Sequence, residues 1–331
     1  MLCAHCSQEQ SDALACGLLE IGYTRGSKLA LWLANETEHL CAVLAASRIG
    51  CTIVSIDPHA NADAVRDVLK AEGCRGLMFG QRFKSEHRGK AVQSITDLST
   101  YHWGDMVNDK SMRKLRHLIN TGHEDIRGVI QYKHFPVYNP SPNPLPSIKL
   151  SKDDVLIVPY TASADGAASR GEPLTQGDLI STAKSAAKSM SLGGDDVVCV
   201  AAWQHSRFGL AAGTLAALHA GAKVRAALSL HGVWLPRVFT VRVPGRLQVI
   251  IPAREENASA ALNSVAEFGA TAFVGRAHSL ADAPGLATFD LSSLRSGLLG
   301  MSRCACGHAS PQNTDPVVLL CVQPELLRRR S

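Results

Sequence analysis

Apolar residues in the first eighty positions fall into alternating strand-like and helix-like segments. Near-continuous apolar runs predict buried strands at 28–33, 52–56 and 76–79. Segments of helical periodicity predict helices at 8–22, from an Asn35 N-cap to about residue 49, and at 62–72. Strands that alternate with helices through short loops are typical of a parallel sheet covered by helices on both faces. The sequence therefore predicts an α/β fold built on parallel β-sheets.

The same alternation resumes after residue 150. It predicts strands at 155–158, 197–201, 222–228 and 271–274, and helices at 176–190, 207–220 and 258–268. Residues 80–150 read as irregular and are Pro-rich at 138–146, residues 229–256 have no readable place in a sheet, and periodicity is lost after Cys304. We therefore expect an N-terminal α/β subdomain with a linker (1–150), a second α/β subdomain (151–303) and an irregular tail (304–331).

Composition narrows the classes of partner. Hydrophobic residues make up 46% and charged residues 19% of the 331 residues, which is typical of a globular protein. The net charge of +5 suits an anionic ligand but lacks the clustered basic stripe expected for nucleic-acid binding. No apolar run reaches the roughly 18–20 residues that a membrane helix needs. The first residues also lack the features of a signal or transit peptide, so they predict a cytoplasmic location.

The ten cysteines are irregularly spaced and do not predict a disulfide framework. Cys304, Cys306 and His308 offer only three crowded ligands, whereas a structural zinc site needs four. We therefore expect ordinary reduced thiols and no metal centre.

A Ser/Thr/Gly-containing loop at 160–171 follows the strand at 155–158, and a helix opens shortly after it at Leu174. Backbone N–H groups and hydroxyls in such a loop can converge on an anion. The pattern indicates a phosphate-binding function.

Three blocks, at 17–79, 155–224 and 262–297, together resemble the adenylate-forming (AMP-binding) family of acyl-CoA synthetases, most closely its medium-chain acyl-CoA ligase type. The resemblance implies a two-step reaction on a fatty or related carboxylic acid. The acid reacts with ATP to give an acyl-adenylate and pyrophosphate, and coenzyme A then displaces AMP. ATP, Mg²⁺ and coenzyme A are the implied cofactors, and family members of this type are usually mitochondrial.

Residues that match family motifs carry the implied contacts. The residues implied to bind the nucleotide are Thr161, Ser163, Gly166, Arg170 and Gly171. His205 matches a histidine near the acyl pocket, and Gly275 matches a glycine in the adenine and acyl wall. From the residue alone, His205 reads equally as a helix-start or core histidine.

The loop departs from the family pattern. Ser163 stands where the family has Gly, and Ala164 and Asp165 stand where it has Thr. After Gly275, the family's Pro-Thr is replaced by Arg276-Ala277-His278. Asp165 puts a carboxylate where phosphates are expected, and two unit charges ~4 Å apart repel by about 4 kcal/mol at an effective dielectric near 20. We expect weakened ATP binding unless Arg170 or Mg²⁺ compensates.

The family's Tyr-Gly-x-Thr-Glu segment, its ribose-binding Asp and its C-terminal lid with the adenylation lysine are not found in the sequence. We therefore expect an incomplete N-terminal part of the fold, weakly active or inactive as a ligase. The alternative is a non-catalytic ligase-like domain that binds a nucleotide or a protein. A dinucleotide-dependent enzyme or a hydrolase is disfavoured, because neither Gly-x-Gly-x-x-Gly nor Gly-x-Ser-x-Gly occurs. We also hypothesise that 229–256 and 304–331 are misread exon boundaries or intron-derived sequence, which transcript sequencing would test.

Overall fold

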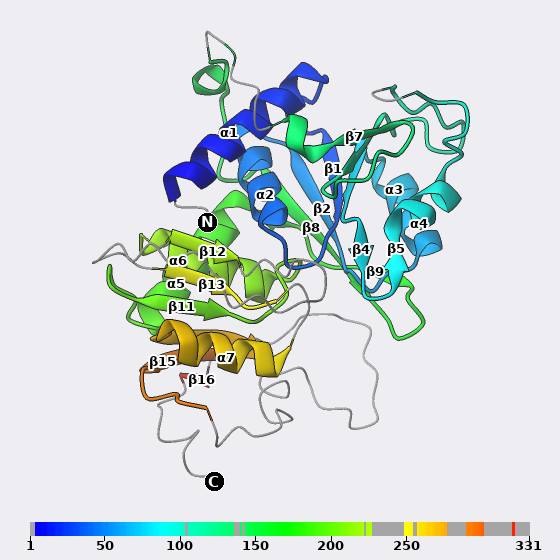
Figure 1. Cartoon of the computed structure of the whole chain (residues 1–331). Coiled ribbons are helices and arrows are strands. Elements are labelled where there is room, and N and C mark those ends of the chain that lie inside the picture. Colours follow the sequence, from blue (N-terminus) through cyan, green and yellow to red (C-terminus); the bar gives the residue numbers. More distant parts are fainter. Residues whose placement is uncertain are drawn as a thin grey trace. The chain divides into compact units, whose positions relative to one another are not determined.

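The fold is seen in a computed structural model, which describes residues 4–102, 105–135, 140, 143–221, 223–226, 248–253, 257–276, 289–300 and 320–321. The chain forms two compact units (Figure 1). The first unit is Gln8–Gly177, and the second consists of Met1–Ser7 and Asp178–Ser331. In the described part of the chain no helix combines the length and apolar character needed to cross a bilayer.

The first unit is built on one large sheet. Its strands are β1 (Lys28–Trp32), β2 (Thr52–Ile56), β3 (Gly76–Phe79), β6 (His117–Asn120), β7 (Val129–Gln131), β8 (Val155–Ala162), β9 (Ala168–Arg170) and β10 (Leu174–Thr175). The strand order is β10-β8-β2-β1-β3-β6-β7, with β9 paired to β8. From β8 to β7 in this order all pairs are parallel, whereas β9 and β10 run antiparallel to β8. The prediction of a parallel sheet is confirmed.

Helices of the first unit follow the predicted alternation. They are α1 (Ala4–Glu20), which begins in the second unit, α2 (Thr37–Ile49), α3 (Ala62–Glu72), α4 (Arg88–Ile95) and the short 3-10 turns η1 (Tyr132–His134) and η2 (Leu145–Ser147). Gly50 and Gly73 end α2 and α3 in the left-handed conformation, with φ of 68° and 62°. The predicted Asn35 N-cap is wrong: Glu36 occupies the cap, and Asn35 is buried ahead of the helix.

Alternating side chains of the strands build the core. Ala30 and Trp32 of β1 belong to a buried cluster with Val65 and Leu69 of α3 and Val92 of α4. Because successive strand residues point to opposite faces, Leu29 and Leu31 of β1 face away from this cluster. Figure 1 shows α2 and α3 on either side of β1 and β2, as the crossovers of a doubly covered sheet require.

A buried arginine ties together the ends of two central strands. Arg88, which is 1% exposed, donates hydrogen bonds to the carbonyl oxygens of Trp32 (2.6 Å) and Pro58. Its guanidinium lies 4.0 Å from the Trp32 ring centroid and 4.8 Å from that of Phe83. Burial lowers the pKa of Arg88 to about 10, so the group stays charged at neutral pH. Cation–π contacts and carbonyl acceptors thus replace the water that this charge has lost.

Residues 80–150 are more regular than their sequence predicts. They supply α4 and two sheet strands, β6 and β7, together with the small hairpin of β4 (Arg82–Phe83) and β5 (Glu86–His87). The sequence does not predict β6 and β7, because each strand has only two apolar residues and ends in a buried polar one, Asn120 or Gln131.

The second unit carries its own sheet, in the order β12-β13-β11-β14-β15-β16. Its strands are β11 (Val197–Val200), β12 (Lys223–Ala226), β13 (Gln248–Ile251), β14 (Ala272–Arg276), β15 (Ser296–Gly300) and β16 (Leu320–Cys321). Only β16 is antiparallel to its described neighbour. Its helices are α5 (Gln176–Ser189), which begins in the first unit, the π-helix η3 (Phe208–Leu215), α6 (Ala216–His219) and α7 (Ala258–Phe268).

One sequence interpretation of this unit is corrected. Residues 229–256 do contribute to the sheet, because β13 pairs in parallel with both β11 and β12. The sequence does not predict this four-residue strand, because the surrounding residues include several prolines and arginines. Residues 229–247 and 254–256, and those after 304 apart from β16, lie outside the described residues.

Candidate nucleotide site

The predicted phosphate loop is a hairpin at the carboxyl end of β8. Tyr160 of β8 pairs with Ile56 of the parallel strand β2, so the loop leaves the sheet at the edge where parallel α/β sheets bind ligands. The chain then turns back as β9, with Tyr160 opposite Arg170 and Thr161 opposite Ser169. We call residues 161–171 the phosphate-loop hairpin. It brings together all five residues that the family resemblance implies for the nucleotide.

The tip of the hairpin is closed by its own hydrogen bonds. The Ser163 N–H donates to the Ala167 carbonyl (2.8 Å), and the Gly166 N–H donates to the Ser163 carbonyl (2.9 Å). The Asp165 carboxylate accepts from the Ser163 hydroxyl and from the Ala167 N–H (3.2 Å). Gly166 adopts a φ of +83°, which a residue with a side chain rarely tolerates.

These bonds determine how well the tip fits a phosphate. Three N–H groups and one hydroxyl point into the turn, so they are not presented to an incoming anion. The hydrogen bonds from Ser163 and Ala167 lower the pKa of Asp165, so an ionised carboxylate stands exposed at the tip. As folded, residues 163–167 therefore offer few free donors to a nucleotide phosphate.

Two side chains that sequence analysis missed hold the hairpin against β2 and α3. The Asp57 carboxylate accepts from the Ala162 N–H (3.1 Å) and from Nδ1 of His59 (2.9 Å). Asn61 donates its N–H to the Gly166 carbonyl (3.0 Å), while its side chain caps α3 by accepting from the Ala64 N–H (2.9 Å). In the sequence, Asp57 reads only as part of an Asp-Pro turn, and Asn61 only precedes the helix predicted at 62–72.

Replacing Asn61 with alanine should destabilise the chain by about 1 kcal/mol, because α3 loses its N-cap. Urea denaturation would measure the loss. Asn61→Ser keeps a capping oxygen and should recover most of the stability. Equal destabilisation by both variants would contradict the assignment of the cap.

Arg170 is held by a buried carboxylate. Glu72, whose side chain is 6% exposed, accepts hydrogen bonds from Arg170 Nε (2.7 Å), Lys28 Nζ (2.6 Å) and the Tyr160 hydroxyl (2.9 Å). Burial alone would raise the pKa of Glu72, but bonds from Lys28, Arg170 and Tyr160 outweigh it and lower the pKa to about 2. The one cation of the hairpin is therefore engaged within the fold.

The other predicted hairpin residues have defined places. Thr161 is exposed, and its carbonyl accepts from the Ser169 hydroxyl (3.3 Å). Gly171 donates its N–H to the Pro159 carbonyl (2.8 Å), and a Cβ at Gly171 would lie 3.0 Å from the Pro159 ring. Glycine thus permits the close approach of the two strands at the base of the hairpin.

The two residues predicted to bind the acid belong to the second unit. His205 is 8% exposed, and its ring centroid lies 5.8 Å from that of Trp203, just ahead of η3. Gly275 lies in β14, where a Cβ would come within 2.5 Å of the Phe273 ring. Ala277 and His278, which replace the family residues near Gly275, lie outside the described residues.

Within the described ranges, no group of three or more His, Cys, Asp or Glu side chains is placed to hold a metal ion. Cys304, Cys306 and His308 fall outside those ranges.

Comparison with known proteins places these features in a family. The model of the AMP-binding enzyme family matches residues 7–235. The putative acyl-CoA synthetase YngI of Bacillus subtilis is 23% identical over 293 residues, which are 87% of this chain and 49% of YngI. The mitochondrial medium-chain acyl-CoA ligase ACSF2 of Homo sapiens is 33% identical over 88 residues, which are 27% of this chain and 14% of ACSF2. The chain thus spans at most about half the length of these relatives.

Solved structures share the fold. A putative long-chain-fatty-acid CoA ligase from Rhodopseudomonas palustris aligns with a TM-score of 0.64 at 17% identity, over 93% of this chain and 63% of the ligase. The anthranilate CoA ligase AuaEII, solved with anthranoyl-AMP, aligns with a TM-score of 0.65 at 16% identity, over 89% of this chain and 50% of AuaEII. These likenesses confirm the predicted fold class.

Proposed function

The chain belongs to the AMP-binding enzyme family, and from this premise we propose that it is an acyl-CoA synthetase-like protein whose nucleotide site is the phosphate-loop hairpin. The reaction is activation of a fatty or related carboxylic acid by ATP, with release of pyrophosphate, followed by transfer of the acyl group from AMP to coenzyme A. ATP, Mg²⁺ and coenzyme A are its cofactors at the family level. His205 and Gly275 are assigned to the acid pocket by their match to family positions.

We further propose that this polypeptide adenylates weakly or not at all. The closed hairpin tip is the observation that carries this proposal. The N–H groups of Ser163, Gly166 and Ala167 donate hydrogen bonds within the turn. The ionised Asp165 carboxylate repels phosphate. Stabilisation of phosphate charge by preorganised donors is a main source of catalysis in such reactions, so a tip without those donors should catalyse poorly.

A non-catalytic ligase-like domain is the second candidate. The ion pair between Arg170 and Glu72 favours the non-catalytic candidate, because the cation of the hairpin then stabilises the fold. Such a domain would bind a nucleotide weakly through the remaining hairpin groups, or would act through a protein partner.

An ATP–pyrophosphate exchange assay with medium-chain acids separates a weakly active ligase from the non-catalytic domain. Exchange above background that is abolished by Thr161→Ala would establish an active ligase and overturn the second candidate. Ser185→Ala, at an exposed residue on α5, is the matched hydroxyl-loss control and should leave any exchange unchanged. No exchange together with measurable ATP binding is the result we expect for a non-catalytic domain.

A further inference from the structure

A cationic site lies in the first unit, away from the hairpin tip. A pocket of about 340 Å³ opens between the end of α3 and the loop before β6. The loop, residues 110–115, contains both buried apolar residues and exposed charged ones. Met112 and Leu115 are 4% and 1% exposed and anchor it in the core, which leaves Lys110, Arg113 and Lys114 exposed.

The loop is held in shape by a turn of its own. The Asp109 carboxylate accepts from the Ser111 N–H and hydroxyl, both at 2.7 Å, and from the Thr96 hydroxyl at 2.9 Å. Burial would raise the pKa of Asp109, but these hydrogen bonds, those from Ser111 first, lower it. The cations of the loop are therefore presented from a fixed backbone.

Four cations line the pocket without an ion-pair partner among the described residues. Lys70, on α3, joins Lys110, Arg113 and Lys114, and none of the four side chains makes an ion pair within the described ranges. Glu72 also lines the pocket, but its carboxylate is engaged by Lys28 and Arg170. The carboxyl end of α3 adds only roughly half an elementary negative charge. The four cations outnumber the carboxylates of Glu72 and of Asp109, which precedes Lys110, so the local charge is positive.

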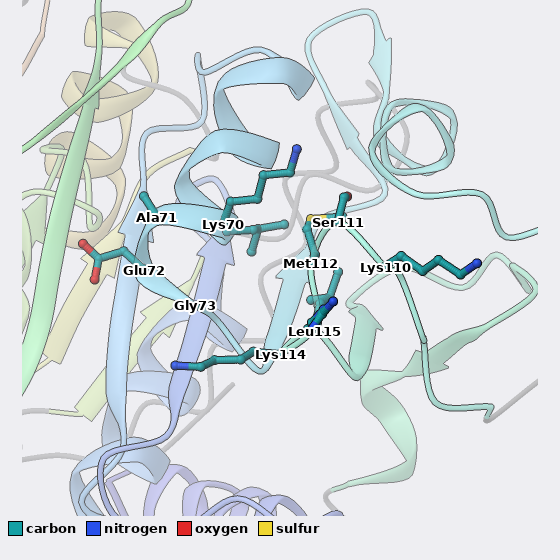
Figure 2. Close-up of a pocket in the computed structure, with 11 residues that line it drawn as sticks. Lys70, Ala71, Glu72, Gly73, Lys110, Ser111, Met112, Lys114 and Leu115 are labelled. Atoms are coloured by element: carbon teal, nitrogen blue, oxygen red, sulfur yellow. The ribbon is translucent and has the colours of Figure 1, made fainter.

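The arrangement of the cations limits the kind of anion. Figure 2 shows the side chains of Lys70, Lys110 and Lys114 extending from the pocket in different directions. Cations spread in this way reach separate charged groups more readily than they converge on one atom. Because the pocket lies before the amino ends of β3 and β6, whereas the hairpin tip follows β8, one phosphate chain held at the tip would not occupy both places.

We propose that this pocket binds an anion that carries two or more phosphate groups, either a soluble polyphosphate or the headgroup of a phosphorylated lipid. The site is separate from the proposed acyl-CoA synthetase function and does not depend on it. Lysine ammonium groups act as point charges for phosphate, and Arg113 adds a planar fork that can bind two oxygens of one group.

Calorimetric titration of the full chain with inorganic tripolyphosphate at low salt tests the proposal. The Lys110→Glu/Arg113→Glu variant should weaken binding at least about tenfold, because two of the four cations become anions. The matched control, Lys90→Glu/Lys188→Glu, makes the same change in net charge at exposed lysines outside the pocket and should bind like the unmodified chain. Equal loss in both variants, or no difference from the unmodified chain, would overturn the proposal.

Vesicles distinguish the two sources of phosphate. Phosphatidylcholine vesicles with phosphatidylinositol bisphosphate should retain the chain if a lipid headgroup is the ligand, and vesicles without it should not. Binding to tripolyphosphate alone would identify a soluble ligand. Retention that survives Lys110→Glu/Arg113→Glu would place vesicle binding elsewhere and count against the pocket.

Discussion

Changing Ser163 to Gly together with Ala164 and Asp165 to Thr should tighten ATP binding about 100-fold, since removal of one carboxylate ~4 Å from a phosphate relieves up to about 4 kcal/mol of repulsion. The change also deletes the side chains that close the tip, because the Ser163 hydroxyl and the Asp165 carboxylate both bond inside the turn. The N–H group of Ala167 then becomes available to phosphate oxygens. Two threonine hydroxyls supply further donors.

Equilibrium titration of ATP against the triple variant and the unmodified chain measures the gain. Asp165→Asn alone removes the charge but keeps a side chain of the same size, so it should give a smaller part of the gain. Asp153→Thr, an exposed residue ahead of β8, matches the change in net charge and should leave ATP affinity unaltered. An unchanged affinity in the triple variant would show that the hairpin tip does not face the nucleotide.

Much of the fold could be predicted because local patterns and tertiary structure agree in the central strands. The residues of β2 are all buried, and three of the five are the β-branched apolar residues Ile53, Val54 and Ile56. Gly73 ends α3 where a left-handed residue is needed. β6 and β13 could not be predicted in this way. β6 has only two apolar residues, Leu118 and Ile119, and β13 lies in a segment that contains several prolines and arginines. The place of each in a sheet depends on neighbours distant in sequence, β3 for one and β11 for the other.

The site was only partly predictable for a related reason. A motif identifies the hairpin from consecutive residues, and Tyr160 to Gly171 could be read in that way. The groups that determine its electrostatics come from other segments: Glu72 lies 98 residues before Arg170, and Asp57 lies 105 residues before Ala162. Nothing local to Glu72 signals its role, because a glutamate before a C-terminal glycine is common on solvated helix ends.

The second large effect is on the free energy of unfolding and concerns Glu72. Replacing Glu72 with glutamine should destabilise the chain by about 2 kcal/mol at neutral pH, allowing for partial exposure of the two cations that the carboxylate pairs with. Lys28 and Arg170, at 32% and 48% side-chain exposure, would then lie beside each other without the shared anion. Glu172→Gln, at an exposed glutamate, makes the same chemical change and should cost almost nothing.

The pH dependence of this loss tests its electrostatic origin. Folding lowers the pKa of Glu72 from 4.5 to about 2, so the unfolded chain takes up a proton at higher pH than the folded one. The stability from the ionised carboxylate is therefore fully present above about pH 4.5 and disappears as the pH falls towards 2. Urea denaturation across this range should show the stabilities of the Glu72→Gln variant and the unmodified chain converging at low pH. A constant difference would mean that glutamine disturbs packing, and that the bonds from Lys28, Arg170 and Tyr160 do not depend on the charge of Glu72.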